Sequence, residues 1–219
     1  LHRHDFIGVD VAVTPFPRRG YQRREVEEFL RTAARLSVFA PQVAVAGGSF
    51  KLKVDVKNVG AGHNLPTGPS TEREMWLEVI AANRSGKILF ESGTLDKQGD
   101  LRGGHGDVKQ QDPQLALFTD RFVDAKGETV FFMWQAHALE EHTIPPLQTR
   151  SANYEFKIPE QFAGEELRLS VRLRFRAFPP HQLRRLGIGN LAGRFPVFEL
   201  GAYSSPAIPV KKSTRREGI

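Results

Sequence analysis

The 219-residue chain contains no cysteine. This absence excludes disulfide bridges, zinc–thiolate clusters and a cysteine nucleophile. It also excludes covalent attachment of a c-type haem to this chain, because that linkage requires a C-x-x-C-H motif. No apolar run approaches the roughly 18 residues that a membrane-spanning helix needs, so no transmembrane segment is predicted.

The common catalytic signatures are missing as well. The sequence has no G-x-S-x-G, no P-loop, no G-x-G-x-x-G after a strand and no H-E-x-x-H. The nearest approach to a metal or catalytic set is His137 with Glu141 and His142, whose side chains are expected to diverge where a strand passes into a loop. We therefore predict that the chain is not an enzyme, with a metal-binding or catalytic role of these three residues as an alternative.

The chain is basic, with 31 Lys and Arg against 25 Asp and Glu and a formal net charge of +6. Its length fits one large domain, or one domain with extensions. Because the chain starts at Leu1 and not at Met, we expect it to be processed or a fragment.

Alternating apolar and polar residues indicate several half-buried strands, over 50–57, 75–80, 88–90, 154–158 and 167–176. Residues 130–139 are apolar on both faces, which predicts a central strand covered on each side. Residues 22–36 instead show apolar positions at helical spacing, which predicts one amphipathic helix of about four turns. Short strands, Gly/Pro turns and one helix together predict a mainly β fold, an immunoglobulin-like antiparallel β-sandwich.

The predicted organisation has four parts. An extended N-terminal segment (1–20) contacts a haem or a partner, and an amphipathic helix with its lead-in (21–40) follows. The β-sandwich (41–205) includes a polar, glycine-rich surface loop at 92–113. A flexible basic tail (206–219) without hydrophobic periodicity ends the chain.

Four arginines share one face of the strand 167–176, at positions 168, 172, 174 and 176. This row has three interpretations: a phosphate-binding stripe, a solvated face, or a contact for carboxylate-bearing partners. Few aromatic residues alternate with these arginines on that face of the strand, so the strand offers no platform on which single-stranded bases could stack. We therefore do not predict binding to nucleic acid.

Of the seven histidines, His63 has the most constrained surroundings. It lies in a turn with glycines at 60, 62 and 68, which permit positive φ, and with Pro66, which stiffens the chain. A ring held in a fixed place suits a ligand, and equally a structural turn whose His and Asn bond the local backbone; both readings stay open. His105 and His181 are interpreted as surface or hydrogen-bonded residues.

Several stretches, in this order along the chain, resemble the C-terminal β-sandwich region of large bacterial multihaem c-type cytochromes. In that family a haem-binding part ends in an H-x-F-x-G stretch, and a short helix and the sandwich follow it. The resemblance spans roughly residues 2 to 200 and rests on six stretches: His4–Asp10, Asn58–Gly68, Glu74–Val79, Gly86–Gly93, His142–Pro146 and Leu173–Pro180.

The resemblance implies site residues one position at a time. His4 matches the histidine that commonly serves as distal axial ligand of a c-type haem, and so becomes the expected ligand of the iron. His2 is the neighbouring alternative, and His63 a weaker candidate for ligation or for packing against a haem edge. Arg3, which flanks His4, is the expected partner of a haem propionate.

The resemblance also implies a function. The expected protein is a non-catalytic domain or subunit of a multihaem electron-transfer assembly, periplasmic or extracellular. Because C-x-x-C-H motifs are absent, its haem c would be attached to a partner chain or to an upstream haem domain. The alternative function is a haem-independent adhesion or assembly module with the same sandwich.

Overall fold

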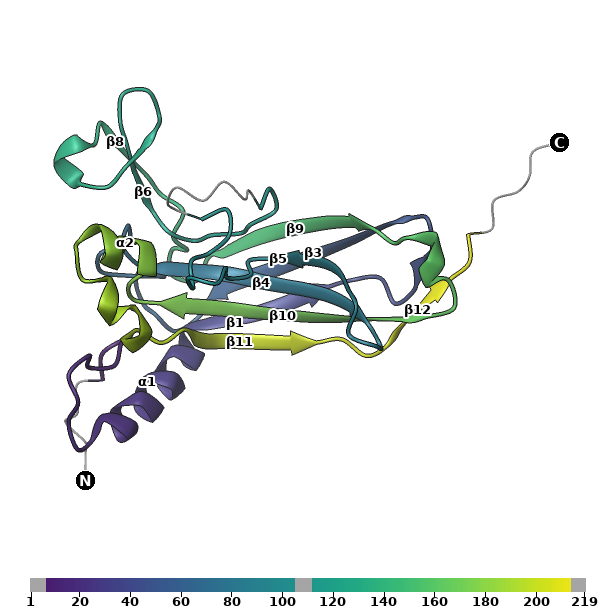
Figure 1. Cartoon of the computed structure of the whole chain (residues 1–219), viewed down its shortest axis with the longest axis horizontal. Coiled ribbons are helices and arrows are strands. Elements are labelled where there is room, and N and C mark those ends of the chain that lie inside the picture. Colours follow the sequence, from purple (N-terminus) through teal and green to yellow (C-terminus); the bar gives the residue numbers. More distant parts are fainter. Residues whose placement is uncertain (1–6, 105–111, 214–219) are drawn as a thin grey trace.

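Two β-sheets packed face to face form the body of the protein (Figure 1). The computed structural model describes residues 7–104 and 112–213. The first sheet has the order β1 (Ala34–Phe39), β3 (Ser49–Asn58), β9 (Thr149–Lys157), with both pairings antiparallel. The predicted mainly β sandwich preceded by one amphipathic helix is confirmed.

The second sheet is built around β10 (Glu166–Arg176), the longest strand. Its order is β2 (Ala44–Val45), β12 (Ile208–Lys211), β10, β4 (Glu74–Asn83), β5 (Ile88–Ser92). The strand β11 (Phe198–Ser204) pairs with β10 beyond the end of β12. All of these pairs are antiparallel except β2 with β12, which is parallel.

The core lies between the two sheets and follows the period-two pattern of the sequence. Every second residue of β3 and β10 points inward and is buried. The inward residues of these strands are Phe50, Leu52, Val54 and Val56 on β3, and Leu167, Leu169, Val171, Leu173 and Phe175 on β10.

The helix α1 covers Arg19–Ala33, three residues earlier than predicted at both ends. It packs on the core through Val26, Leu30 and Ala33, which confirms its amphipathic character. It ends where Ala34 pairs with Asn58 of β3, since sheet hydrogen bonds there replace those of the helix. No helix of residues 7–104 and 112–213 is long and apolar enough to cross a membrane.

The predicted central strand over residues 130–139 is wrong. This region belongs to a small three-stranded sheet that projects from the sandwich, made of β6 (Arg121–Val123), β7 (Thr129–Val130) and β8 (Ala138–Glu140). A 3₁₀ turn, η1 (Met133–Gln135), separates β7 from β8. Phe131, Phe132 and Trp134 contact one another at this turn, so the apolar run here marks part of the projecting sheet and not a covered strand.

The prediction that the chain lacks regular structure after Pro206 is also wrong for residues 208–211. Strand β12 forms there, with Ile208 and Val210 buried and the alternate residues exposed. Its alternation extends over only four residues, too short to stand out beside Pro209 and the lysines that follow. The strand forms because residues 208–211 pair with β2 and β10, a contact that the local sequence does not indicate.

The predicted glycine-rich loop over 92–113 is a connection without named strands over its described residues 93–104 and 112–113, while Ser92 is the last residue of β5. It is not merely a surface loop, since Asp100 and Leu101 are buried. Gly93 has a φ of +70°, and any Cβ at this position would collide with the carbonyl oxygen of Leu77. Only glycine therefore lets the loop run this close to β4.

Further along, Gln114 lies beside the outer edge of β9. Its side-chain amide donates to the carbonyl oxygen of Glu155 at 3.0 Å and accepts from the Glu155 backbone N–H at 2.7 Å. One side chain thus reproduces the two hydrogen bonds that a neighbouring strand makes.

Candidate functional site

Four of the six stretches that carry the family resemblance meet at one end of the sandwich. The strands β3 and β10 end there, and β4 and β9 begin there. We call this the helical end, because α1, α2 (Pro180–Arg185) and the 3₁₀ turn η3 (Gly189–Arg194) lie at it (Figure 1). Stretches far apart in sequence are therefore neighbours in space.

His63 lies at the helical end in an exposed turn. Its ring Nδ1 is 3.1 Å from the carbonyl oxygen of Asn64. The turn is held from beneath by Asn58, which is 1 % exposed and whose Nδ2 donates to the His63 carbonyl at 2.7 Å. These contacts match the structural interpretation of the turn, and they leave the proposed contact of His63 with a haem untested.

The His63 turn is joined to the His142–Pro146 stretch. Leu65 and Ile144 exchange backbone hydrogen bonds of 2.9 and 2.8 Å. Asn58 donates a further bond to the Ile144 carbonyl at 2.9 Å, and Asn64 bonds the Thr143 hydroxyl at 3.2 Å. Two motifs recognised separately in the sequence thus form one rigid unit.

The arginine row of β10 is largely neutralised within the molecule. Arg174 donates to both carboxylate oxygens of Glu78, at 3.0 and 3.1 Å. Arg172 lies 3.4 Å from Glu78 and 3.6 Å from Glu199. The carboxylate partners are therefore on neighbouring strands of the same sheet, which argues against a free phosphate-binding stripe.

Arg176 forms a buried ion pair with Glu74, directly opposite it on β4. The two side chains are 3 % and 1 % exposed, and Nε donates to Glu74 Oε2 at 2.5 Å. Arg176 also donates to the Gly99 carbonyl and lies 5.4 Å from the ring centroid of Trp76. Burial raises the pKa of the Glu74 carboxyl, and the Arg176 charge opposes that shift.

A second charged group ties α2 to the loop at 93–104. The Asp100 carboxylate accepts the His181 backbone N–H at 2.8 Å and pairs with Arg184. Burial lowers the pKa of His181 to about 4, the Asp100 charge opposes this, and Arg176, Arg184 and Arg185 lower it further. The imidazole is therefore neutral near pH 7.

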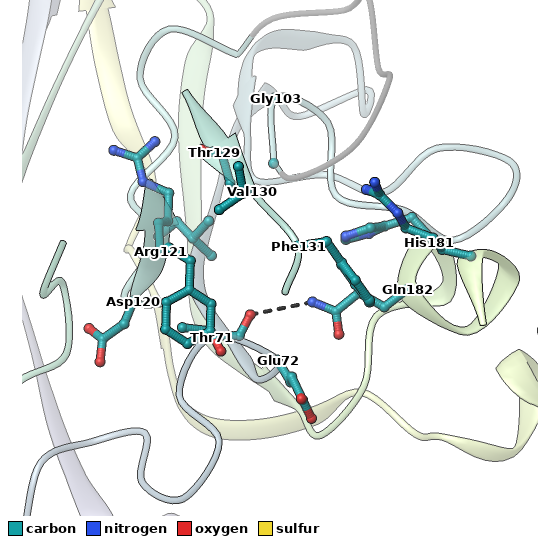
Figure 2. Close-up of a pocket in the computed structure, with 14 residues that line it drawn as sticks. Thr71, Glu72, Gly103, Asp120, Arg121, Thr129, Val130, Phe131, His181 and Gln182 are labelled. Atoms are coloured by element: carbon teal, nitrogen blue, oxygen red, sulfur yellow. Dashed lines mark hydrogen bonds between the residues drawn. The ribbon is translucent and has the colours of Figure 1, made fainter. Parts of the chain in front are cut away.

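A cavity of about 360 Å³ lies between α2 and the projecting sheet (Figure 2). Gln182 lines the cavity, and its side-chain amide donates to the Thr71 carbonyl at 3.3 Å. His181, Phe131 and Val130 line its walls. The volume lies in the range of ligand pockets, but the lining mixes acidic, basic and apolar groups and selects no ligand class.

The projecting sheet exposes aromatic side chains beside this cavity. Phe132 and Trp134 stack at a centroid distance of 4.2 Å, and Phe131 meets Phe132 edge to face. Trp134 and Met133 remain 78 % and 71 % exposed. Sequence reasoning placed these residues in the core, so it missed a surface of the kind that binds partners.

The N-terminal stretch carries the predicted haem ligands. His2, Arg3 and His4 lie outside the described residues, so their roles stay predictions. The residues that follow are anchored: Val11 is buried, and Ile7 and Val9 pack against the core. The Ala12 backbone N–H donates to the Gln22 side chain of α1 at 3.0 Å.

The alternative site at His137, Glu141 and His142 gains no support. His142 Nε2 lies 3.6 Å from Glu140 Oε2, while His137 and Glu141 are exposed. In the part of the chain that the structure describes, no three His, Asp or Glu side chains are grouped to hold a metal ion. Contributing one axial histidine to a haem iron that another segment or chain binds does not require a cluster of three metal ligands.

Among solved structures, a cytochrome has a similar fold. The penta-haem cytochrome c552 from Thermochromatium tepidum matches with a TM-score of 0.60 and 18 % sequence identity, over 82 % of this chain. The chain spans 41 % of that cytochrome's length. The C-terminal domain of wzt matches at a TM-score of only 0.37 and 7 % identity, over 83 % of this chain and 74 % of that one. No protein-family model and no curated protein sequence matches the chain. Over 82 % of its length the chain thus shares a fold with part of a penta-haem cytochrome.

Proposed function

We propose that the chain is a non-catalytic domain or subunit of a multihaem cytochrome electron-transfer assembly outside the cytoplasm. The observation that carries this proposal is the fold shared with the penta-haem cytochrome c552 over 82 % of the chain. The gathering of the resembling stretches at the helical end supports that end as the surface facing a haem-bearing part.

His4 is the proposed distal axial ligand of a haem c attached to a partner chain or an upstream haem domain. This role rests on the match of His4, in the stretch His4–Asp10, to the position of the distal ligand in the family that the sequence resembles. His2 is the neighbouring alternative ligand. Arg3, which precedes His4 in the sequence, is the proposed partner of a haem propionate.

The donor set fits one imidazole contributed to a haem that is attached to a partner chain or to an upstream haem domain. The chain has no cysteine for a covalent link, and its described part groups no metal ligands of its own. A haem with two histidine ligands is coordinatively saturated and transfers single electrons. This chain would position the imidazole, exclude water from that side and supply positive charge near the propionates, all of which tune the potential.

A second candidate function is a haem-independent assembly module. The exposed Phe132–Trp134 stack favours it, because rigid aromatic side chains commonly anchor protein interfaces. In both candidate functions the sandwich binds a partner protein or domain. They differ in whether a histidine of this chain ligates a haem iron.

The deciding experiment is a reduced-minus-oxidised visible spectrum of the native assembly, with haem staining of its separated subunits. We expect low-spin bands, with stain on a companion band and none on this chain. His4→Ala is expected to convert one haem to a high-spin or altered low-spin form, and His137→Ala, at an exposed histidine, serves as the control.

Two outcomes would overturn the proposal. If no haem is found anywhere in the assembly, the module function remains. If haem is present but neither His4→Ala nor His2→Ala alters the spectrum, the axial-ligand role is wrong and only a scaffold role survives.

A further inference from the structure

A cavity of about 280 Å³ opens where the N-terminal segment, the start of α1 and the end of η3 converge. It is separate from the cavity of Figure 2 and shares no lining residue with it. The residues that line it come from these three segments and from the start of the next connection: Val11, Arg19, Gly20, Arg23, Gly193, Arg194 and Pro196.

Three arginines, Arg19, Arg23 and Arg194, are among the residues of this lining. Arg19 Nε donates to the Ala12 carbonyl at 3.0 Å, and Arg194 Nη1 donates to the Val13 carbonyl at 3.2 Å. Each of these bonds uses one of the five N–H donors of a guanidinium, so the group is oriented while most of its donors remain available. Arg23 pairs with Glu27 at 2.9 Å through Nε alone.

The charge of this cavity is one-sided. Among residues 7–104 and 112–213, no carboxylate lines it, and neither Arg19 nor Arg194 forms an ion pair. This contrasts with the arginines of β10, which face Glu74 and Glu78 across the strand pair. The first turn of α1 adds no acidic side chain to the cavity.

The wall is also open to a ligand. A Cβ built at Gly20 or at Gly193 would meet no atom within 4 Å, so backbone and not side chain bounds the space there. Guanidinium groups bind carboxylate and phosphate oxygens through paired N–H donors, which a lone ammonium cannot do.

We propose that Arg19, Arg23 and Arg194 form a binding site for an oxyanion group, a carboxylate or a phosphate. One source is a propionate of the haem held by the partner, and this source rests on the proposed function. The other is a free anion such as inorganic phosphate. The oxyanion site itself depends on neither.

The first arm of the test uses inorganic phosphate and the 219-residue chain, with binding followed by calorimetric titration. We expect saturable binding that weakens with added salt, and a loss of about tenfold or more in Arg19→Gln and in Arg194→Gln. Arg31→Gln is the matched control, since it lies eight residues beyond Arg23, about 12 Å along the same helix. Its affinity is expected to stay within about twofold of the parent.

Because Arg19 and Arg194 also hold the backbone at Ala12 and Val13, their loss bears on folding. Arg194→Lys keeps the charge and loses the paired donors, so it is expected to bind phosphate more weakly while its thermal unfolding matches the parent. Absence of saturable phosphate binding at millimolar concentration, or equal binding by the parent and both Gln variants, overturns the site.

The second arm compares haem with its dimethyl ester, in which the propionates are masked, by the shift of the Soret band on addition to the chain. If a propionate occupies the site, Arg194→Gln weakens binding of haem and not of the ester. If phosphate binding depends on the arginines while haem binding does not, the site takes a free anion. His4→Ala tests iron ligation separately, so loss of the proposed function leaves the phosphate result intact.

Discussion

The buried Glu74–Arg176 pair offers a sharp test of how the helical end is stabilised. In Arg176→Met the guanidinium is lost, and Glu74, 1 % exposed, keeps a buried carboxyl without its partner. Breaking a buried pair on one side lowers the free energy of unfolding by about 3–5 kcal/mol. For a chain of this size that corresponds to a decrease of roughly 6–20 °C in Tm.

The assay is urea denaturation followed by tryptophan fluorescence, with Arg172→Met as the control. Arg172 is 43 % exposed and pairs at longer distance, so its loss is expected to change stability by only about 0–1 kcal/mol. A double variant, Glu74→Leu with Arg176→Met, removes both charges. It is expected to recover most of the loss, apart from the Gly99 carbonyl that Arg176 also satisfied.

The pH dependence gives an independent check. Arg176 opposes the rise that burial causes in the pKa of Glu74, so the Arg176→Met change raises that pKa further. A carboxyl whose folded pKa exceeds its unfolded pKa destabilises the fold at high pH and less as the pH falls. The deficit of the variant should therefore shrink between pH 7 and about pH 5. A single variant no less stable than Arg172→Met, or a deficit that grows on acidification, would refute this account.

Three further predictions concern the same end of the molecule. Asn58→Ala removes three side-chain hydrogen bonds, two donated to the His63 and Ile144 carbonyls and one accepted from the Ala61 N–H, so we expect a loss of about 2–4 kcal/mol in unfolding free energy and faster hydrogen exchange at the Ile144 amide. The pKa of His181, lowered to about 4, means that the folded state resists protonation, so stability should fall as the pH drops from about 6.5 to 4. His181→Asn should flatten that slope in thermal unfolding measured across the window, and an unchanged slope contradicts the assignment. Trp134→Phe leaves only the fully buried Trp76, so fluorescence emission should shift to shorter wavelength and resist acrylamide quenching, with stability changed by less than about 0.5 kcal/mol. A red-shifted, readily quenched spectrum in this variant would contradict the placement of Trp76.

The strands were predictable where one face is buried and the other solvated. The alternation over 50–57 and 167–176 records burial directly, and both strands form as expected. The same rule fails for residues 130–139, which run from the end of β7 through η1 to β8 in the projecting sheet and leave Met133 and Trp134 exposed. The local pattern shows that residues are apolar, and it does not show whether the fold covers them or leaves them exposed.

The site was predictable only in part for a related reason. The motifs of the His63 turn and the His142 stretch were visible as separate segments, but their contact through Asn58 is a matter of topology. The cavity lined by Arg19 and Arg194 joins residues some 175 positions apart, and no local signal links them. The pairing of Glu74 with Arg176 depends on the register between β4 and β10, which no local signal in either strand gives.

The side-chain amide of Gln114 has a consequence for how the protein meets others of its kind. An uncovered strand edge is a template onto which another chain adds its own backbone, and open edges lead to sheet extension and aggregation. At Glu155 that template is already filled by the chain itself. Growth of the sheet from β9 is thus blocked at Glu155, near the C-terminal end of the strand.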